Sequence, residues 1–203
     1  VGPLKALVED LDVRFASLAP EFVGDPKTSL FRIYRDVRFS KDKSPYKTHA
    51  AAWIFHRAPG RGVGKEIDGG AGFYVHVEPG ASLIAGGMWM PPRPSLAKIR
   101  ARFDDDLAGW ERAVSAPAFK RRFGKLTDDE PGILLKRLPR GFAEGHPAER
   151  WLRYNSFTVS CAYSDVEILS PKLVDRAMKD FALIVPMCRW LNTALGHPPA
   201  RSR

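Results

Sequence analysis

The stretch from Arg32 to His49 brings together residue types that bind anions and move protons. Its sequence, RIYRDVRFSKDKSPYKTH, holds six Arg or Lys residues, two Asp, two Tyr and one His. Guanidinium and ammonium groups donate hydrogen bonds to phosphate and carboxylate oxygens, and tyrosine hydroxyls add further donors. We therefore expect an anion site here, for a phosphate or a carboxylate. The expected binding residues are Arg32, Arg35, Arg38, Lys41, Lys43, Tyr46 and Lys47.

The same stretch allows other interpretations, because acids interrupt its positive charge. Asp36 and Asp42 can pair with neighbouring cations and hold the loop without binding anything. One alternative is a nucleic-acid-binding module, with basic side chains on phosphates and Tyr34, Tyr46 or Trp53 stacked on bases. Another is a non-catalytic protein-interaction domain that uses the polar face of a sheet. We favour an anionic small molecule, because a surface that follows phosphates usually excludes carboxylates.

Groups suited to acid and base chemistry lie at the end of this stretch and in the segment FYVHVEP. His76 and Glu78 alternate on one face of a predicted strand, and His56 could project from the same face if the preceding strand pairs with it. Histidine and carboxylate side chains are common general acids and bases. The candidate catalytic residues are His49, His76, Glu78 and Tyr34. The alternative is that these histidines are ordinary surface residues, and the sequence names no reaction.

The spacing of the histidines and cysteines is not that of a typical metal site. Two His and one carboxylate are the minimum for a facial site, but neither H-x-H nor H-x-x-x-H occurs in the sequence. The glycine-rich stretch GRGVGKEIDGGAG lacks the G-x-x-x-x-G-K-[ST] spacing of a phosphate loop. Cys161 and Cys188 share no metal-ligand spacing. We therefore predict no metal and no cofactor.

Composition places the chain among globular proteins with a basic surface. It has 203 residues, 44% of them hydrophobic, and a formal net charge of +9. This length suits one substantial core, so we expect a single α+β domain over residues 1–203 with a frayed tail at 197–203. No long apolar run or signal peptide is visible, and two cysteines suit a reducing cytoplasm. Because the chain opens on Val1, we expect a native segment to precede it.

Hydrophobic periodicity predicts the elements that must hold these groups in place. Apolar residues at steps of three and four predict helices over residues 4–18, 95–110, 117–123 and 171–191. Ser95 is the expected cap of the second helix, and Pro186 predicts a kink in the last one. Alternating apolar and polar residues predict strands over residues 31–39, 50–57, 73–79, 82–90 and 157–164.

The order of these elements predicts the fold class. Most of the strands follow one another without room for crossover helices, which indicates an antiparallel meander. We expect an α+β fold in which an antiparallel sheet of about four to six strands is packed on one face by N-terminal and C-terminal helices. The opposite face of the sheet would then carry the ionic residues.

Several motifs, taken together, resemble a known family. They are RIYRDVRFSKDKSPYKTH, GFYVHVEPG, AGGMWMP, LKRLPRGFAEGHP, SDVEILSPKLVD and RWLNTAL. In this order the chain resembles, from about Leu4 to Leu195, the bacterial family called domain of unknown function 2461. Trp53, Phe55 and the stretch YNSFTVSCAYS depart from the family's usual pattern. The resemblance implies a shared fold and no reaction, because the family's activity is not established.

Overall fold

A single antiparallel sheet forms the centre of the structure. The computed structural model describes residues 2–35, 38, 43–58 and 70–200. The sheet has five strands in the order β1-β2-β3-β4-β5. They are β1 (Phe22–Val23), β2 (Ala50–His56), β3 (Gly72–Val77), β4 (Ser82–Met88) and β5 (Phe157–Tyr163). The predicted α+β class and antiparallel sheet are therefore confirmed, and the short β1 is a strand that periodicity did not indicate.

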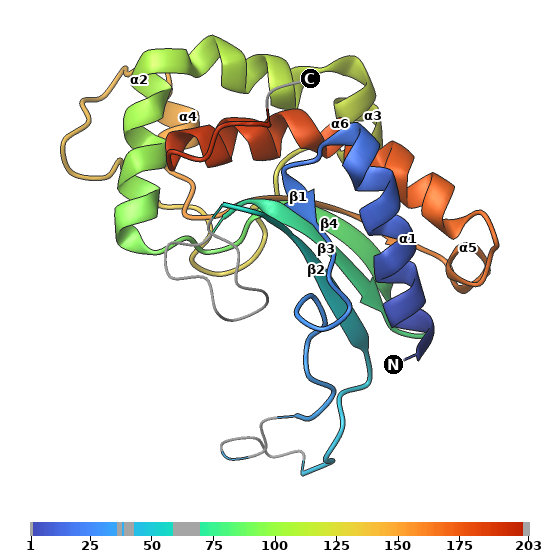
Figure 1. Ribbon diagram of the computed structural model, residues 1–203. Helices are drawn as coiled ribbons and strands as arrows, with labels where there is room; N and C mark the ends of the chain where they lie inside the picture. The colour runs from blue at the N-terminus through green and yellow to red at the C-terminus, as the bar shows by residue number, and fades with distance from the viewer. Residues whose placement is uncertain (1, 36–37, 39–42, 59–69, 201–203) are drawn as a thin grey trace.

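Helices cover one face of this sheet (Figure 1). The described helices are α1 (Gly2–Leu18), α2 (Arg93–Ser115), α3 (Pro117–Phe123), α4 (Glu149–Leu152), α5 (Asp165–Ile168) and α6 (Leu173–Ala194); of these, α1, α3 and α6 contact the strands, and α2 packs on α6. α1 and α6 pack against the strands and each other, as predicted for N-terminal and C-terminal helices. Phe73 lies at the centre of this contact, with its ring 4.8 Å from that of Phe15 and 5.1 Å from that of Phe181. In the described part of the chain, no helix has the length and apolar character needed to cross a membrane.

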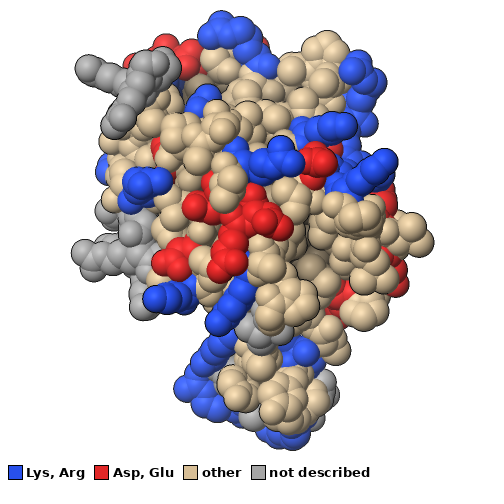
Figure 2. Space-filling view, turned by 45° about the vertical axis from the view of Figure 1, so that its right-hand side comes forward, with Lys and Arg blue, Asp and Glu red and all other residues tan. Residues whose placement is uncertain are grey.

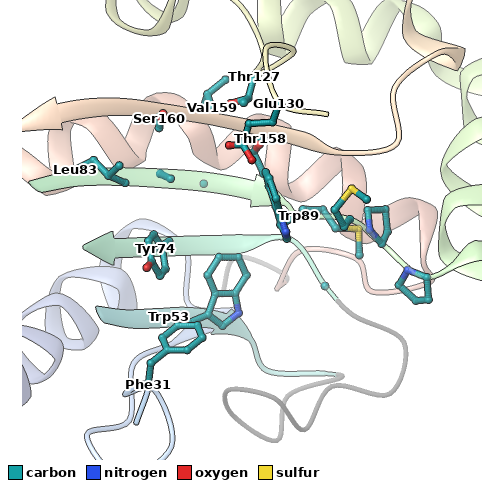
Figure 3. Close-up of a pocket in the computed structure, with 17 residues that line it drawn as sticks. Phe31, Trp53, Tyr74, Leu83, Trp89, Thr127, Glu130, Thr158, Val159 and Ser160 are labelled. Carbon is teal, nitrogen blue, oxygen red and sulfur yellow. The ribbon is translucent and has the colours of Figure 1, made fainter. Parts of the chain in front are cut away.

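The opposite face of the sheet carries the side chains that point away from α1 and α6. The strand register pairs Trp53 with Tyr74, Tyr74 with Ala85, and Ala85 with Ser160, so these residues form one row across four strands. We call this the open face. Figure 3 shows Trp53, Tyr74, Leu83 and Ser160 on it. Because neighbouring residues of a strand point to opposite faces, the same strands bury Phe73 and display Tyr74.

The predicted strand over residues 31–39 does not form in its described part. Isolated bridges join Leu30 to Ala52 and Tyr34 to Tyr46, and the Lys47 amide donates to the Ile33 carbonyl. We call the described residues 31–35, 38 and 43–49 the basic arm. Figure 1 shows it projecting below the sheet, and Figure 2 shows Lys and Arg side chains on the projecting part. A two-stranded hairpin without a covering layer is only marginally stable in water, which explains its irregular backbone.

Smaller differences concern the ends and interior of the helices. α2 begins at Arg93 with Pro92 at the N-cap position, and Ser95 is buried in the first turn instead of capping it. Proline is tolerated at the start of a helix because the first backbone amides have no hydrogen-bond partner within the helix. α2 is interrupted at Asp106, where the backbone leaves helical geometry, whereas α6 is assigned as one helix with Pro186 inside it.

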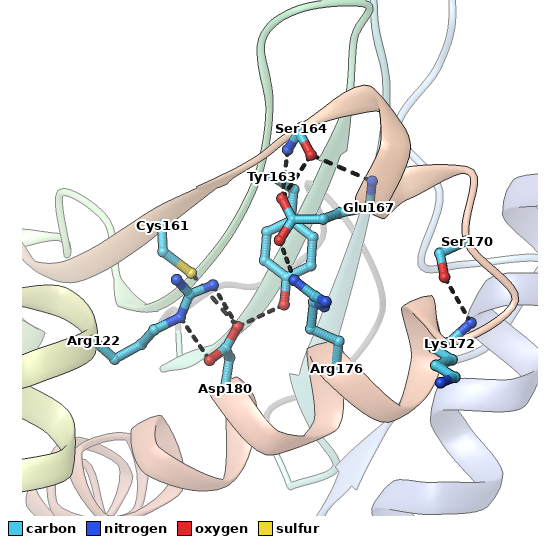
Figure 4. A network of polar contacts seen from close by, with 9 residues as sticks. All are labelled: Arg122, Cys161, Tyr163, Ser164, Glu167, Ser170, Lys172, Arg176 and Asp180. Carbon is cyan, nitrogen blue, oxygen red and sulfur yellow. Dashed lines mark hydrogen bonds and ion pairs between the residues drawn. The ribbon is translucent and has the colours of Figure 1, made fainter.

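A buried carboxylate ties α3, β5 and α6 together (Figure 4). Asp180 of α6 accepts hydrogen bonds from Nε and Nη2 of Arg122, both at 2.7 Å, and from the Tyr163 hydroxyl at 2.5 Å. Cys161 lies beside this group with its thiol 3.9 Å from Asp180. Burial, together with the negative charge of Asp180, raises the pKa of Cys161 to about 12. The thiol is therefore protonated at neutral pH, which agrees with a structural rather than a nucleophilic role.

Replacing Asp180 with Asn should destabilise the fold far more than the same change at Asp175. We expect Asp180→Asn to lower the free energy of unfolding by about 2–3 kcal/mol, because it removes the charge that pairs with Arg122. Asp175 lies on the same helix as Asp180 and pairs with Arg14 of α1, but both side chains of this pair are more than half exposed, so Asp175→Asn should cost less than about 1 kcal/mol. Urea unfolding measures both, and equal losses would contradict the structural role of Asp180.

Candidate functional site

Three side chains on β3 and its end form a hydrogen-bonded row. The Tyr74 hydroxyl lies 3.0 Å from Nδ1 of His76, and Nε2 of His76 lies 3.0 Å from Oε2 of Glu78. They sit at alternate positions, so they share the open face. An ionised carboxylate only accepts hydrogen bonds, so a neutral His76 carries its proton on Nε2 and its Nδ1 accepts from Tyr74. The row therefore runs from a phenol through an imidazole to a carboxylate.

His49, the residue directly before β2, joins this row. Ala50 pairs with Val77, so the register places His49 opposite Glu78. The rings of His49 and His76 are stacked, with centroids 4.3 Å apart and planes 30° apart. One ligand atom from each of His49, His76 and Glu78 lies within 4.8 Å of the other two, and in the described residues this is the one group of three such ligands. The structure thus brings together three of the four candidate catalytic residues.

Tyr34, the fourth candidate, lies away from this cluster, and the tyrosine beside His76 is Tyr74. Tyr34 is on the basic arm, 57% exposed, with its ring 5.5 Å from that of Tyr46. The alternation of FYVHVEP puts Tyr74 on the same face as His76 and Glu78, and this was the signal that could have identified it.

The surroundings shift the pKa values of these groups in different directions. The pKa of His49 is lowered by partial burial first, and then by the positive charges of His76, Lys47 and Arg35. The pKa of Glu78 is lowered mainly by hydrogen bonds from Thr48 and His76, which keeps the carboxylate ionised. Burial, assisted by Glu78, raises the pKa of Tyr74 and so keeps its hydroxyl protonated at neutral pH.

A cavity of about 800 Å³ adjoins this row on the open face. Tyr74 belongs to both the row and the cavity wall. Figure 3 shows the cavity between Phe31 and Trp53 on one side and Trp89, Thr158 and Ser160 on the other. Ala85 contributes only a methyl group between Tyr74 and Ser160, which leaves the space open. The cavity is therefore mainly apolar, with four aromatic side chains in its wall, and Tyr74 and Glu130 bring a hydroxyl and a carboxylate to it.

A sharp turn after β4 positions one wall of the cavity. Met90 has φ 40°, in the left-handed region that is costly for residues other than glycine. The Met90 amide donates to the Ser156 hydroxyl, which in turn donates to the Met88 carbonyl. This turn carries Trp89, which is 53% exposed and lies at the cavity.

The basic arm reaches the cavity through Lys47 and Phe31. The Lys47 ammonium lies 5.9 Å from the ring centroid of Phe31, and Phe31 lines the cavity. Arg35 and Lys47 are half-buried, and the positive charge of each lowers the pKa of His49. Among the other expected binding residues, four are exposed: Arg32, Arg38, Lys43 and Tyr46. Lys41 lies outside the described residues. An anion site on the arm remains a prediction, and Lys47 is the member that the structure places beside the cavity wall.

The suggestion that His56 shares a face with His76 is wrong. His76 pairs with Ala51, so the open face carries the odd-numbered residues of β2 and the even-numbered residues of β3. His56 therefore points to the helix-covered face, where it is buried and its ring lies 5.4 Å from that of Phe22. The strands pair as expected, but periodicity within each strand could not define the register between them.

Titration of the His49 ring, followed by proton NMR, should give a pKa below its ordinary value of 6.5. Glu78→Gln should lower the pKa further, because the carboxylate favours the charged ring, and Lys47→Gln should raise it. Lys120→Gln, on α3, should leave it unchanged. Because the folded-state pKa is lowered, the contribution of His49 to stability is complete above pH 6.5 and is lost as the pH falls. A pKa of 6.5 or higher would contradict these charge effects.

Comparison with known proteins identifies a family and no individual relative. No curated protein and no solved structure matches the chain. Residues 1–190 match the family described as conserved hypothetical protein (DUF2461), a range that includes the whole sheet and every residue of the row on the open face. The family expected from the sequence motifs is thereby confirmed. The chain belongs to the DUF2461 family of conserved hypothetical proteins.

Proposed function

We propose that the protein binds a small molecule with an aromatic or apolar body and an anionic group, and that Tyr74, His76 and Glu78 move a proton to or from it. The observation that carries this proposal is the position of Tyr74, whose side chain lines the cavity while its hydroxyl is hydrogen-bonded to His76. A cavity alone would support binding, and a surface histidine alone would support nothing. Their connection through one residue supports both binding and acid–base chemistry.

The walls of the cavity suit the apolar part of such a ligand. Its volume of about 800 Å³ lies in the range of small-molecule sites. Phe31, Trp53 and Trp89 offer ring faces on which a planar group can stack. Burying an apolar group of the size of a leucine or phenylalanine side chain contributes about 1.5–3 kcal/mol. Because a dissociation constant of 1 mM already corresponds to about 4.1 kcal/mol, apolar contact supplies part of the affinity, and the polar groups at the edge supply the rest and orient the ligand.

The basic arm suits the anionic part. Lys47 lies over Phe31 at the cavity wall, and Arg35 adds a second positive charge near His49. At a protein surface, opposite charges 4 Å apart attract by about 4 kcal/mol at an effective dielectric constant of 20, before desolvation is subtracted. The formal net charge of +9 adds a longer-range attraction for anions. A phosphate or carboxylate would thus lie at the Lys47 end of the cavity.

The row on the open face would act as a proton relay in which Tyr74 faces the ligand. When the Tyr74 oxygen takes a proton from the bound molecule, its own proton passes to Nδ1 of His76. His76 then carries a positive charge, which the ionised Glu78 stabilises through the Nε2–H hydrogen bond. The proton that passes from Tyr74 to His76 moves over a contact of 3.0 Å, a distance suited to direct transfer.

A second candidate function, binding of single-stranded nucleic acid, is favoured by one observation. Tyr34 and Tyr46 are 57% and 55% exposed and form an aromatic pair on the basic arm. Exposed aromatic rings between positive charges form a platform on which bases stack while phosphates contact Lys and Arg. This function would use the tip of the arm and leave the cavity and the row of Tyr74, His76 and Glu78 unexplained.

Calorimetry with 1-naphthyl phosphate, in the presence of EDTA, tests the main proposal. Ala85→Leu should weaken binding at least about tenfold, because the larger side chain fills the cavity. Lys47→Met should weaken it about fivefold, while binding of the uncharged 1-naphthol is unchanged. Lys120→Met removes a positive charge on α3 and serves as the matched control. Equal affinity of wild type and Ala85→Leu for the phosphate would exclude the cavity as the site.

Fluorescence anisotropy with a labelled single-stranded DNA tests the second candidate. If the arm binds nucleic acid, binding at about 50 mM salt should be measurable and should fall steeply as salt is added. Tyr34→Ala combined with Tyr46→Ala should then weaken it about tenfold, because both stacking rings are lost. Trp89→Ala, which removes an exposed ring outside the arm, is the control. No binding by the wild type at this salt concentration would exclude the second candidate.

A further inference from the structure

We propose that His49, His76 and Glu78 form a binding site for a divalent first-row transition metal ion, with zinc as the representative ion. His76 lies in β3, Glu78 directly follows β3 and His49 directly precedes β2, and together they present two imidazoles and one carboxylate on the open face. Two histidines and a carboxylate form a recurrent ligand set for such ions. The inference goes beyond the proposed function, because it concerns an inorganic ligand and does not require the organic one.

The distances in this cluster are close to those of a metal site. Metal–nitrogen and metal–oxygen bonds of about 2.0–2.2 Å place tetrahedral ligand atoms roughly 3.3–3.6 Å apart. The His76 and Glu78 atoms are 3.0 Å apart, and all three ligand atoms lie within 4.8 Å of one another. Closing the site therefore requires movements of about 1 Å, which side-chain rotation can provide without moving the strands.

Binding requires one defined rearrangement, at His49. An imidazole nitrogen binds an ion that lies in the plane of its ring. The rings of His49 and His76 are stacked at 30°, so their planes do not meet at a shared nearby point until one ring turns. His49 precedes β2, whereas His76 lies within β3 and is held on both ring nitrogens. His49 is therefore the ligand that turns toward the ion, and the stack opens when it does.

Tyr74 and Thr48 provide the hydrogen bonds that hold the ligands of such a site in position. Metal-bound histidines generally donate their second ring N–H to a fixed oxygen, which sets the tautomer. If Nε2 of His76 binds the ion, its proton resides on Nδ1 and is donated to the Tyr74 oxygen, over the contact of 3.0 Å already present. The Thr48 hydroxyl donates to the Glu78 carboxylate and holds it in place. Both supports exist before any ion arrives.

The nearby positive charges favour an anion as the further ligand of the metal ion. Arg35 and Lys47 act on His49 and would repel a bare cation. Three protein ligands leave at least one coordination position open, and an anionic ligand there would offset this repulsion. The ion would replace the hydrogen bond between His76 and Glu78, so metal binding and the metal-free proton relay are alternative states of the same residues.

Calorimetric titration of the EDTA-stripped, dialysed chain with zinc chloride alone tests the site. We expect one ion per chain. His49→Ala or Glu78→Gln should lower the affinity more than about 100-fold, and Tyr74→Phe about tenfold, because the first two changes remove ligands and the third removes an outer support. His146→Ala is the matched control: His146 also pairs with a carboxylate, that of Asp104 on α2, at 2.8 Å, but lies outside the cluster of His49, His76 and Glu78.

The outcomes separate this site from the proposed organic ligand. No heat of binding for Zn²⁺, Ni²⁺ or Co²⁺ would overturn the inference, as would equal affinity of the wild type and Glu78→Gln. Loss of binding in His146→Ala would place the ion elsewhere and overturn it too. Glu78→Gln preserves the side-chain shape, so its near-ultraviolet circular dichroism should match the wild type even if His49→Ala fails to fold. Binding of 1-naphthyl phosphate is measured in EDTA, so either proposal can fail without the other.

Discussion

The register between β2 and β3 is the constraint on which the open face depends. Pairing of Ala50 with Val77 and of Ile54 with Phe73 sets which side chains face the helices and which face away. A shift of one residue would turn buried Ile54 toward solvent and remove His49 from the side of His76. Burial of apolar side chains against α1 and α6 excludes that shift. The same packing that stabilises the core therefore holds the polar row in place.

One face of β3 packs in the core, and its other face carries residues of the candidate site. Phe73 packs between Phe15 and Phe181, and the next residue, Tyr74, lines the cavity on the other side. His76 follows Val75, which is buried in the core. A site built on a central strand has less freedom than one on a loop, because its backbone is hydrogen-bonded on both edges. His49 and the basic arm lack this restraint and are the adaptable part of the site.

Much of the fold could be predicted from periodicity, and the site could be predicted only in part. The alternation in FYVHVEP indicates β3 and its polar face, and the apolar steps in α1 and α6 indicate their buried sides, because those patterns are local. The arm failed as a predicted strand because its apolar residues have no layer to cover them. The partnership of His49 with His76, and the separation of His56, depend on pairing between strands, which one strand's pattern does not contain.

The order of the strands along the chain has a kinetic consequence for the cavity. β2, β3 and β4 follow one another closely, whereas residues 89–156, including α2, α3 and α4, separate β4 from β5. Joining β5 to β4 therefore closes a long loop, which carries a larger entropy cost than forming the preceding hairpins. Thr158 and Ser160 of β5 complete the cavity wall. During refolding, the complete cavity wall should therefore form last, so binding of a small molecule would report the pairing of β5 with β4.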